Sequence, residues 1–265
     1  METLSSYFSL SFGDYFIDCS RQLHIEIVII YSHAMIILVD YDNIEYSIRR
    51  RGITHVVNRI VSKIDLAEIN SNRHIHIRLY GGWYEHSRFT HQAQILSADI
   101  LSSFPNVALL SDNHTNAIVN CELAYSILAD PTNHLFNTYR PRGIPSGLKA
   151  RHPSTCSCST PNCPIIETYN FLQNKICSIC NSIRPEDIFY RGEQKLVDTM
   201  LTSDLIFSSN QIANLGIVSS DDDFWPGIKT TLANGKKIIQ LHTRSGNTPA
   251  FYTRTTNNNY IQKQL

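Results

Sequence analysis

The chain alternates short apolar segments, rich in β-branched residues, with amphipathic segments of helical period. The apolar segments, expected to be strands, cover 35–40, 74–80, 106–110, 215–220 and 236–241. The helical patterns cover 53–64, 89–103, 193–207 and 221–235, while 116–128 is apolar without a clear period. Strands that are apolar on both faces and are joined by helices form parallel sheets covered on both sides. We therefore expect a three-layer α/β fold, with an irregular stretch from about 131 to 192.

The length and the apolar content allow one large domain with a substantial core. The chain has 265 residues, of which 42% are hydrophobic. We expect the domain over 35–245, an extension of uncertain structure over 1–34 and a polar tail over 246–265. The extension has no basic start typical of a signal peptide, and Glu26 and His33 interrupt its apolar run. The prediction is a cytoplasmic protein without a membrane span.

Acidic residues directly follow two of the expected strands. Asp40 and Asp42 end the segment MIILVDYDN, and Asp221, Asp222 and Asp223 follow LGIVSS. Each group alone suits a turn or a helix N-terminus. The carboxyl ends of parallel strands meet at one edge of the sheet, where ligands bind in such folds. Their joint position therefore favours a site over two unrelated turns.

A third acidic group lies within the helix expected over 193–207. Lys195 and Asp198 are three residues apart and are expected on one helix face, with Asp204 further along. Carboxylates that gather raise each other's pKa, and proteins tolerate such clusters where Mg²⁺ or Mn²⁺ neutralises them. A cluster of this kind suits the attack of metal-activated water on a phosphodiester.

The blocks VDYDN, EQKLVDTMLTSD and VSSDDDFWPGI together resemble the NYN family of PIN-like nucleases, over residues 35–245. The resemblance implies a PIN/Rossmann-like fold and a nuclease that uses Mg²⁺ or Mn²⁺. It implies RNA as substrate, with tRNA or mRNA as options and single-stranded DNA not excluded. The implied metal ligands are Asp40, Asp198, Asp221 and Asp223, and the other implied site residues are Asn43, Lys195 and Asp204. Asp42 and Asp222 occupy variable positions, and Ser220 stands where many members have glycine.

Five of the seven cysteines have the spacing C-x-C-x4-C-x13-C-x2-C. This spacing predicts a structural Zn²⁺ that holds together a loop-rich insert over 152–182. The preferred ligands are Cys158, Cys163, Cys177 and Cys180, with Cys156 as an alternative and His152 as an outside candidate. Disulfides or redox-active thiols are the competing interpretation.

The formal net charge is zero, so any nucleic-acid contact must come from a local patch. The stretch 139–152 contains no acid and four bases, Arg140, Arg142, Lys149 and Arg151. It suits contact with a phosphate backbone, although a solvated loop is an equal alternative. Tyr80, Trp83 and Tyr84, near Arg78, suit either base stacking or core packing.

Two other functions fit parts of the pattern. A haloacid-dehalogenase-like phosphatase would use Asp40 as nucleophile and Asp42 as general acid, but Asn43 stands where that class usually has Thr or Val. A non-catalytic RNA-binding module would bind through the zinc insert. A homodimer or a protein partner is left open.

Overall fold

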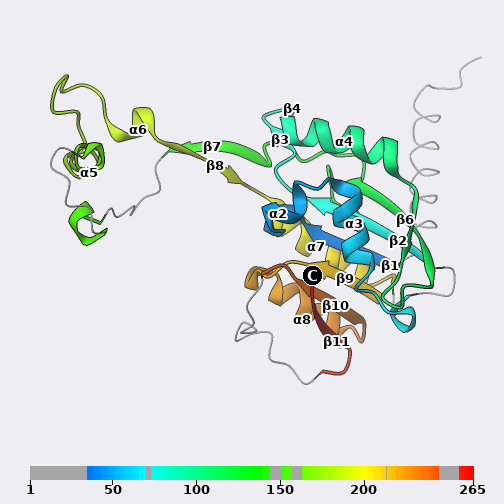
Figure 1. Cartoon of the computed structure of the whole chain (residues 1–265). Helices are drawn as coiled ribbons and strands as arrows, with labels where there is room; N and C mark the ends of the chain where they lie inside the picture. The colour runs from blue at the N-terminus through cyan, green and yellow to red at the C-terminus, as the bar shows by residue number, and fades with distance from the viewer. Residues whose placement is uncertain (1–34, 70–72, 144–150, 157–162, 213, 245–256) are drawn as a thin grey trace, which may run out of the picture.

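The fold is taken from a computed structural model that describes residues 35–69, 73–143, 151–156, 163–212, 214–244 and 257–265. A seven-stranded sheet with the order β11-β10-β9-β1-β2-β6-β5 forms the body (Figure 1). Its strands are β1 Met35–Asp40, β2 His74–Tyr80, β5 Asn106–Leu109, β6 Asn116–Leu123, β9 Asn214–Val218, β10 Lys237–His242 and β11 Tyr260–Gln264. All neighbours pair in parallel except β5 with β6. The prediction of an α/β fold with a mostly parallel sheet is confirmed.

Helices pack against both faces of this sheet. The main ones are α3 Ile53–Val61, α4 His91–Ser103, α7 Val197–Ser209 and α8 Trp225–Ala233. In β1, Ile37 and Val39 join the core under α3 and α4, while Ile36 and Leu38 join the core under α7 and α8. Because β1 is the central strand and is buried on both sides, it needs the continuous apolar run seen in the sequence.

A second, smaller sheet with the order β4-β3-β7-β8 adjoins the body. It contains β3 Tyr84–Glu85, β4 Arg88–Phe89, β7 Tyr139–Gly143 and β8 Tyr190–Gln194. Beyond its base, the β7–β8 ribbon projects from the body as an arm that carries α5 Pro164–Asn174 and α6 Pro185–Ile188 (Figure 1). The prediction of an irregular stretch over 131–192 is therefore wrong. Proline and glycine in the ribbon strands weaken the strand pattern, which explains the error.

The end of the chain is not the polar tail that the sequence predicted over 246–265. Residues Tyr260–Gln264 form β11, an edge strand that pairs in parallel with β10. Tyr260 and Leu265 are buried, whereas Gln262 is exposed. An edge strand with so few buried side chains has a weak apolar signal in the sequence.

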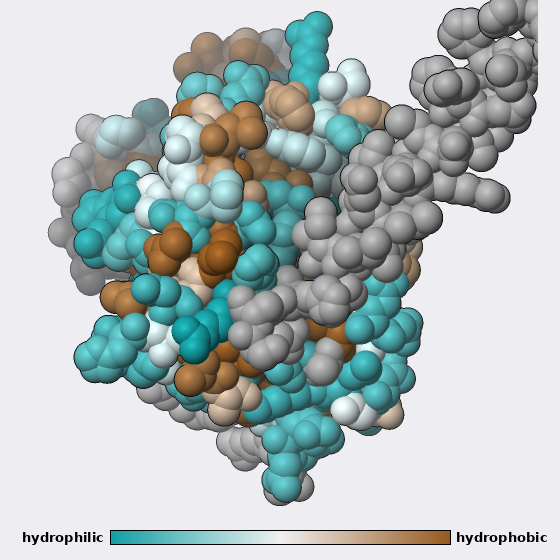
Figure 2. Space-filling view, turned by 90° about the vertical axis from the view of Figure 1, so that its right-hand side faces the viewer, coloured by the Kyte–Doolittle hydropathy of each residue, from teal (hydrophilic) through white to brown (hydrophobic). Residues whose placement is uncertain are grey.

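Shorter helical turns connect these elements, and three of them bear on the site or its rim. They are η1 Tyr41–Asn43, α2 Tyr46–Arg49 and η4 Asp222–Phe224, while η3 Pro153–Cys156 contacts α5 in the arm. The face shown in Figure 2 mixes hydrophilic and hydrophobic side chains. Within the described residues no helix is long and apolar enough to cross a membrane. The extension predicted over 1–34 lies outside those residues.

Candidate acidic site at the carboxyl edge of the sheet

Asp40, the last residue of β1, lies beside the carboxyl end of β9. The Ser219 hydroxyl donates a hydrogen bond to Oδ2 of Asp40 over 3.1 Å. The same hydroxyl oxygen accepts a hydrogen bond from the backbone N–H of Asp221, also over 3.1 Å. Ser219 therefore bridges the two acidic groups that follow β1 and β9.

The carboxylates at this edge influence one another electrostatically. Asp40 is only 6% exposed, and its burial raises its pKa to about 7, with further upward contributions from Asp198 and Asp42. Desolvation also raises the pKa of Asp198, in the first turn of α7, and the charges of Asp221 and Asp223 add to that rise. These side chains come from β1, α7 and the turn after β9. We call Asp40, Asp198, Asp221 and Asp223 the acid cluster.

The loop after β9 holds its own acids in place by local hydrogen bonds. Oδ1 of Asp221 accepts a hydrogen bond from the N–H of Asp223 over 3.1 Å, which caps the start of η4. An acidic cap of this kind also fits the dipole of the turn that follows. Asp222, at the variable position, is exposed.

Asn43 ties the rim of the site together through its side-chain oxygen. Its Oδ1 accepts hydrogen bonds from the N–H of Ser220, over 3.2 Å, and from the hydroxyl of Thr243. These contacts join η1 to the ends of β9 and β10. The structure therefore gives Asn43 a clear positioning contact next to the acid cluster.

Asp42 faces the base of the arm. Its carboxylate lies 2.8 Å from Nη1 of Arg49 and accepts a hydrogen bond from the side chain of Gln194, the last residue of β8. The arm is therefore fastened to η1, the turn that directly follows Asp40. This arrangement gives Asp42 a structural role that the sequence left open.

Lys195 does not lie on the helix predicted over 193–207. It precedes α7, because Leu196 adopts a left-handed conformation with φ of 66° and the helix begins only at Val197. The ammonium group of Lys195 lies 3.1 Å from Glu193. The expectation that Lys195 and Asp198 share a helix face is therefore wrong.

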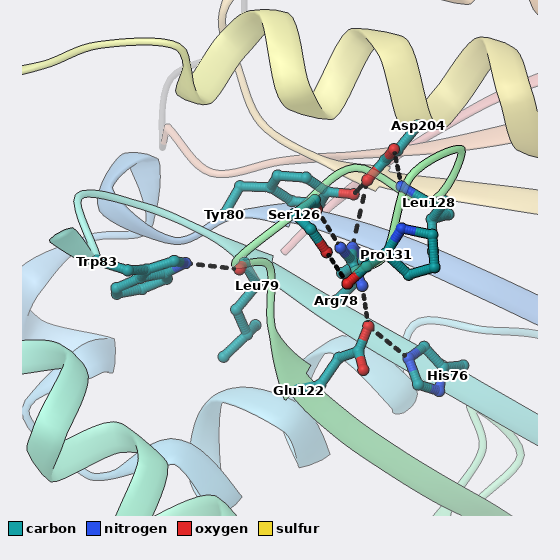
Figure 3. A network of polar contacts seen from close by, with 10 residues as sticks. All are labelled: His76, Arg78, Leu79, Tyr80, Trp83, Glu122, Ser126, Leu128, Pro131 and Asp204. Carbon is teal, nitrogen blue, oxygen red and sulfur yellow. Dashed lines mark hydrogen bonds and ion pairs between the residues drawn. The ribbon is translucent and has the colours of Figure 1, made fainter. Parts of the chain in front are cut away.

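Asp204 lies in the core, in a network of polar contacts shown in Figure 3. It is fully buried, accepting a hydrogen bond from the Tyr80 hydroxyl over 2.5 Å and one from the backbone N–H of Leu128 over 2.6 Å. Nε of Arg78 lies 3.2 Å from its Oδ2. Six helical residues, a rise of about 9 Å, separate Asp204 from Asp198 along α7. These contacts indicate a structural role, rather than the site role implied by the resemblance.

The same network extends along β2 and β6. Arg78 also pairs with Glu122 and donates to the backbone carbonyl of Ser126, and His76 lies 3.3 Å from Glu122. Tyr80 and Trp83 are almost completely buried. Of the two interpretations of these aromatic residues, core packing is the one the structure supports.

Two of the four preferred zinc ligands lie together in the arm. Ser182 and Ile183 direct hydrogen bonds at the thiol of Cys180, and together with the neighbouring Cys177 these contacts lower the pKa of Cys180 to about 6. Cys163 is at the N-cap of α5, and Cys158 lies outside the described residues. The alternative ligand Cys156 is the last residue of η3, and His152 contacts Ser154 and the ring of Tyr169.

The basic patch predicted over 139–152 lies on and beyond the arm. Arg140, in β7, and Arg151 are exposed. Arg142 is in β7 opposite Arg191 of β8, and Lys149 lies outside the described residues. The patch is therefore divided between the ribbon and the segment beyond it.

Across the part of the chain that the structure describes, no three His, Cys, Asp or Glu side chains are grouped so as to hold a metal ion. The acid cluster nevertheless fits a divalent cation in its chemistry. All its donors are carboxylate oxygens, which Mg²⁺ and Mn²⁺ prefer. Burial, followed by the neighbouring carboxylate charges, raises the pKa of Asp40 and Asp198, and a cation would offset both effects. The thiols of Cys177 and Cys180 suit Zn²⁺, because thiolate sulfur is a donor that Zn²⁺ prefers.

Sequence reasoning missed three polar residues that organise the site: Ser219, Gln194 and Thr243. The position of Ser219 could have indicated its role. It is a hydroxyl residue between a buried strand and an acidic loop, where it can hydrogen-bond to the neighbouring strand end and to that loop. Gln194 and Thr243 contact residues far away in the chain, and no local pattern marks them.

A scan against protein-family models finds no family that matches the chain. Searches of curated proteins and of solved structures also find no match. The function is therefore argued from the geometry of the site.

Proposed function

We propose that this protein is a nuclease that hydrolyses phosphodiester bonds, most suitably in RNA, with Mg²⁺ or Mn²⁺. The observation that carries the proposal is the acid cluster, in which β1, α7 and the loop after β9 bring carboxylates together at the carboxyl edge of a parallel sheet, where burial and the neighbouring charges raise the pKa of Asp40 and Asp198. In α/β sheets this edge is where ligands bind. The resemblance of the three acidic blocks to NYN nucleases of the PIN-like class supports RNA as the substrate.

The residues of the cluster have distinct roles in this proposal. Asp40, Asp198, Asp221 and Asp223 would hold the cation through carboxylate oxygens. A bound Mg²⁺ or Mn²⁺ supplies an activated water and stabilises the charge that develops on the phosphate. Ser219 orients Asp40 by its hydrogen bond, and Asn43 holds the two strand ends together.

The arm would supply the contacts to the nucleic acid outside the site. In the proposed arrangement Zn²⁺ is held by Cys177 and Cys180, with Cys158 and Cys163 completing the set. Arg140 and Arg151 are exposed and suit contacts with the phosphate backbone. Thiolate ligands of this kind suit the reducing cytoplasm.

The phosphatase alternative receives less support from the site. It needs Asp42 as a general acid beside Asp40, but the Asp42 carboxylate is engaged by Arg49 and Gln194 at the base of the arm. The non-catalytic binding module has no such obstacle, so the experiment must separate it from the nuclease.

The test is a cleavage assay on mixed RNA and single-stranded DNA pools, without divalent metal and with Mg²⁺ or Mn²⁺. We expect metal-dependent cleavage of RNA by the wild type and its loss in the double variant Asp221→Asn with Asp223→Asn. Asp222→Asn is the matched control, because it removes a neighbouring exposed carboxylate. Absence of cleavage by the wild type with both metals would favour the binding module. A phosphorylated Asp40 trapped with a phosphomonoester would favour the phosphatase.

A further inference from the structure

Five aromatic rings contact one another beside β3, β4 and the base of the arm. We call them the aromatic surface, and they are Tyr84, Phe89, Tyr125, His134 and Phe136. Tyr84 is the central ring, with its centroid 4.8 Å from that of Phe89 and 5.0 Å from that of Phe136. The sequence drew attention to Tyr84 but not to the rings around it.

The outer rings of this cluster are open to solvent. Phe136 is 46% exposed and Phe89 is 39% exposed, whereas Tyr84 beneath them is 5% exposed. Folded proteins usually pack such rings inside, and contiguous exposed apolar surface commonly marks a site of interaction.

The rings are also held in fixed positions before anything binds. The hydroxyl of Tyr84 lies 2.8 Å from Nδ1 of His134, and the hydroxyl of Tyr125 lies 2.7 Å from that of Ser97. Because these side chains are already ordered, a ligand that stacks on them loses less binding energy to the ordering of the protein.

Thr138 links the aromatic surface to the segment that leads into α7. Its hydroxyl accepts a hydrogen bond from the backbone N–H of Tyr84 over 2.9 Å, and its carbonyl accepts one from the backbone N–H of Lys195 over 2.9 Å. Lys195 lies three residues before Asp198. On the sheet, Asp40 pairs in register with Tyr80, which lies four residues before Tyr84. The surface and the acids therefore share one edge of the molecule.

Charged side chains of both signs lie beside the aromatic surface. Arg88, in β4, and Arg140, in β7, are both exposed. Their register partners are acids, Glu85 opposite Arg88 and Glu193 opposite Arg140. Glu193 also pairs with Lys195, so three cations stand against two carboxylates. Exposed rings next to cationic side chains bind single-stranded nucleic acids, because bases stack on the rings while the cations contact phosphates.

We infer that the aromatic surface binds unpaired bases of single-stranded RNA and directs the strand toward the acid cluster. The inference deepens the proposed function and rests on it for the fate of the bound strand. It defines the substrate class as single-stranded rather than duplex RNA, because bases within a helix do not offer their faces for stacking.

Binding is measured by fluorescence anisotropy with the Asp221→Asn, Asp223→Asn variant, so that cleavage does not consume the probe. The probes are a labelled single-stranded RNA of mixed sequence, its duplex and an abasic oligomer of equal length. We expect the single strand to bind about tenfold more tightly than the other two probes. Phe136→Leu and Phe89→Leu, which keep apolar bulk but lose the ring, should each weaken single-strand binding about tenfold. Phe136→Trp, which keeps an aromatic ring at this position, should bind the single strand as tightly as the parent protein.

Leu101→Ala is the control, because Leu101 is 82% exposed on α4 and is not part of the aromatic surface. It should leave affinity unchanged, and all variants should retain the wild-type melting temperature. Equal binding of the abasic oligomer, or wild-type affinity in both leucine variants, would overturn the inference. If Phe136→Leu destabilises the fold, Phe89→Leu and the abasic probe still decide.

The outcome separates this inference from the proposed function. Base-dependent binding without any cleavage by the wild type would overturn the proposal of a nuclease and support the inference that the aromatic surface binds RNA. Cleavage with an unchanged KM in the leucine variants would support the proposal of a nuclease and overturn the inference that the aromatic surface binds its substrate.

Discussion

Arg78 and Asp204 form an ion pair inside the body, with 3.2 Å between Nε and Oδ2. Both side chains are buried, and they join β2 to α7, the helix whose first turn carries Asp198. The pair therefore fixes the depth at which α7 packs on the sheet. Through that packing it also sets where Asp198 lies relative to Asp40.

Asp204→Asn should destabilise the protein by about 1–3 kcal/mol, because it removes the carboxylate that Arg78 faces on α7 while Glu122 still compensates the buried charge. The measurement is urea unfolding followed by circular dichroism. Asp99→Asn, on the exposed face of α4, is the control and should change stability by no more than about 0.5 kcal/mol. A variant at Asp204 with full stability but no RNA cleavage would contradict this role and restore the site role implied by the resemblance.

Asp40 should make the protein less stable as the pH rises from about 4 to about 7. Its folded pKa of about 7 exceeds the ordinary aspartate value of 3.8, so in this range the folded state binds the proton more tightly than the unfolded state. Asp40→Asn should remove this loss and be more stable than the wild type at about pH 8, with the difference disappearing below about pH 4. Unfolding curves in chelator across this range measure the effect.

Millimolar Mg²⁺ provides a second readout for the same residue. It should raise the melting temperature of the wild type at about pH 8 and have less effect on Asp40→Asn, because a ligand that binds the folded state stabilises it. Identical pH profiles for the two proteins, together with an equal response to Mg²⁺, would contradict the prediction. They would show that the charge of Asp40 causes neither the loss of stability with rising pH nor the stabilisation by Mg²⁺.

Cys180 should react with iodoacetamide at neutral pH at least about tenfold faster than Cys121. Cys180 is exposed with a pKa lowered to about 6, whereas burial raises the pKa of Cys121 well above its usual range. Mass spectrometry of labelled peptides measures both rates in one sample. Cys177→Ala should slow the reaction of Cys180, because it removes the side-chain hydrogen bond by which Cys177 contributes to the lowered pKa.

Zinc provides the second test of these thiols. Saturating Zn²⁺ should protect Cys180 from the reagent and leave the slow reaction of Cys121 unchanged. Equal reaction rates of the two cysteines without metal would contradict the expected environment of Cys180.

The arm should be removable without unfolding the body. Gly143 and Tyr190 are register partners, so Asn-Gly in place of residues 144–189 would close the ribbon with a two-residue hairpin turn. We expect the body to stay folded and the unfolding free energy to rise by no more than about 3 kcal/mol, since each halving of a loop saves about 0.6 kcal/mol and 46 residues become two. A shortened protein that fails to fold would show that the arm supports the body.

Strong local patterns made most of the sheet predictable. The run from Met35 to Val39 is apolar on both faces, which only a central strand requires, and α3 buries a regular apolar stripe. By contrast, β7, β8 and β11 bury few apolar side chains and so have no clear period. Leu196 fits the apolar stripe of the helix but lies just before it, because its backbone is left-handed.

The acids at strand ends were predictable as a group, but the role of each one was not. Asp198 and Asp204 belong to the same motif on the same helix, yet only Asp198 lies in the acid cluster. The partner that distinguishes them, Arg78, is on β2, more than a hundred residues earlier in the chain. No single sequence pattern carries a contact of that range.

The bridge through Ser219 joins Asp40 to a segment 179 residues later. The acids can therefore meet only after β9 has been synthesised and has paired with β1. An incomplete chain would carry Asp40 and no Asp221 beside it. If the proposed activity is correct, a half-made molecule is harmless to the RNA around it, and only a chain that has folded through β9 can cut.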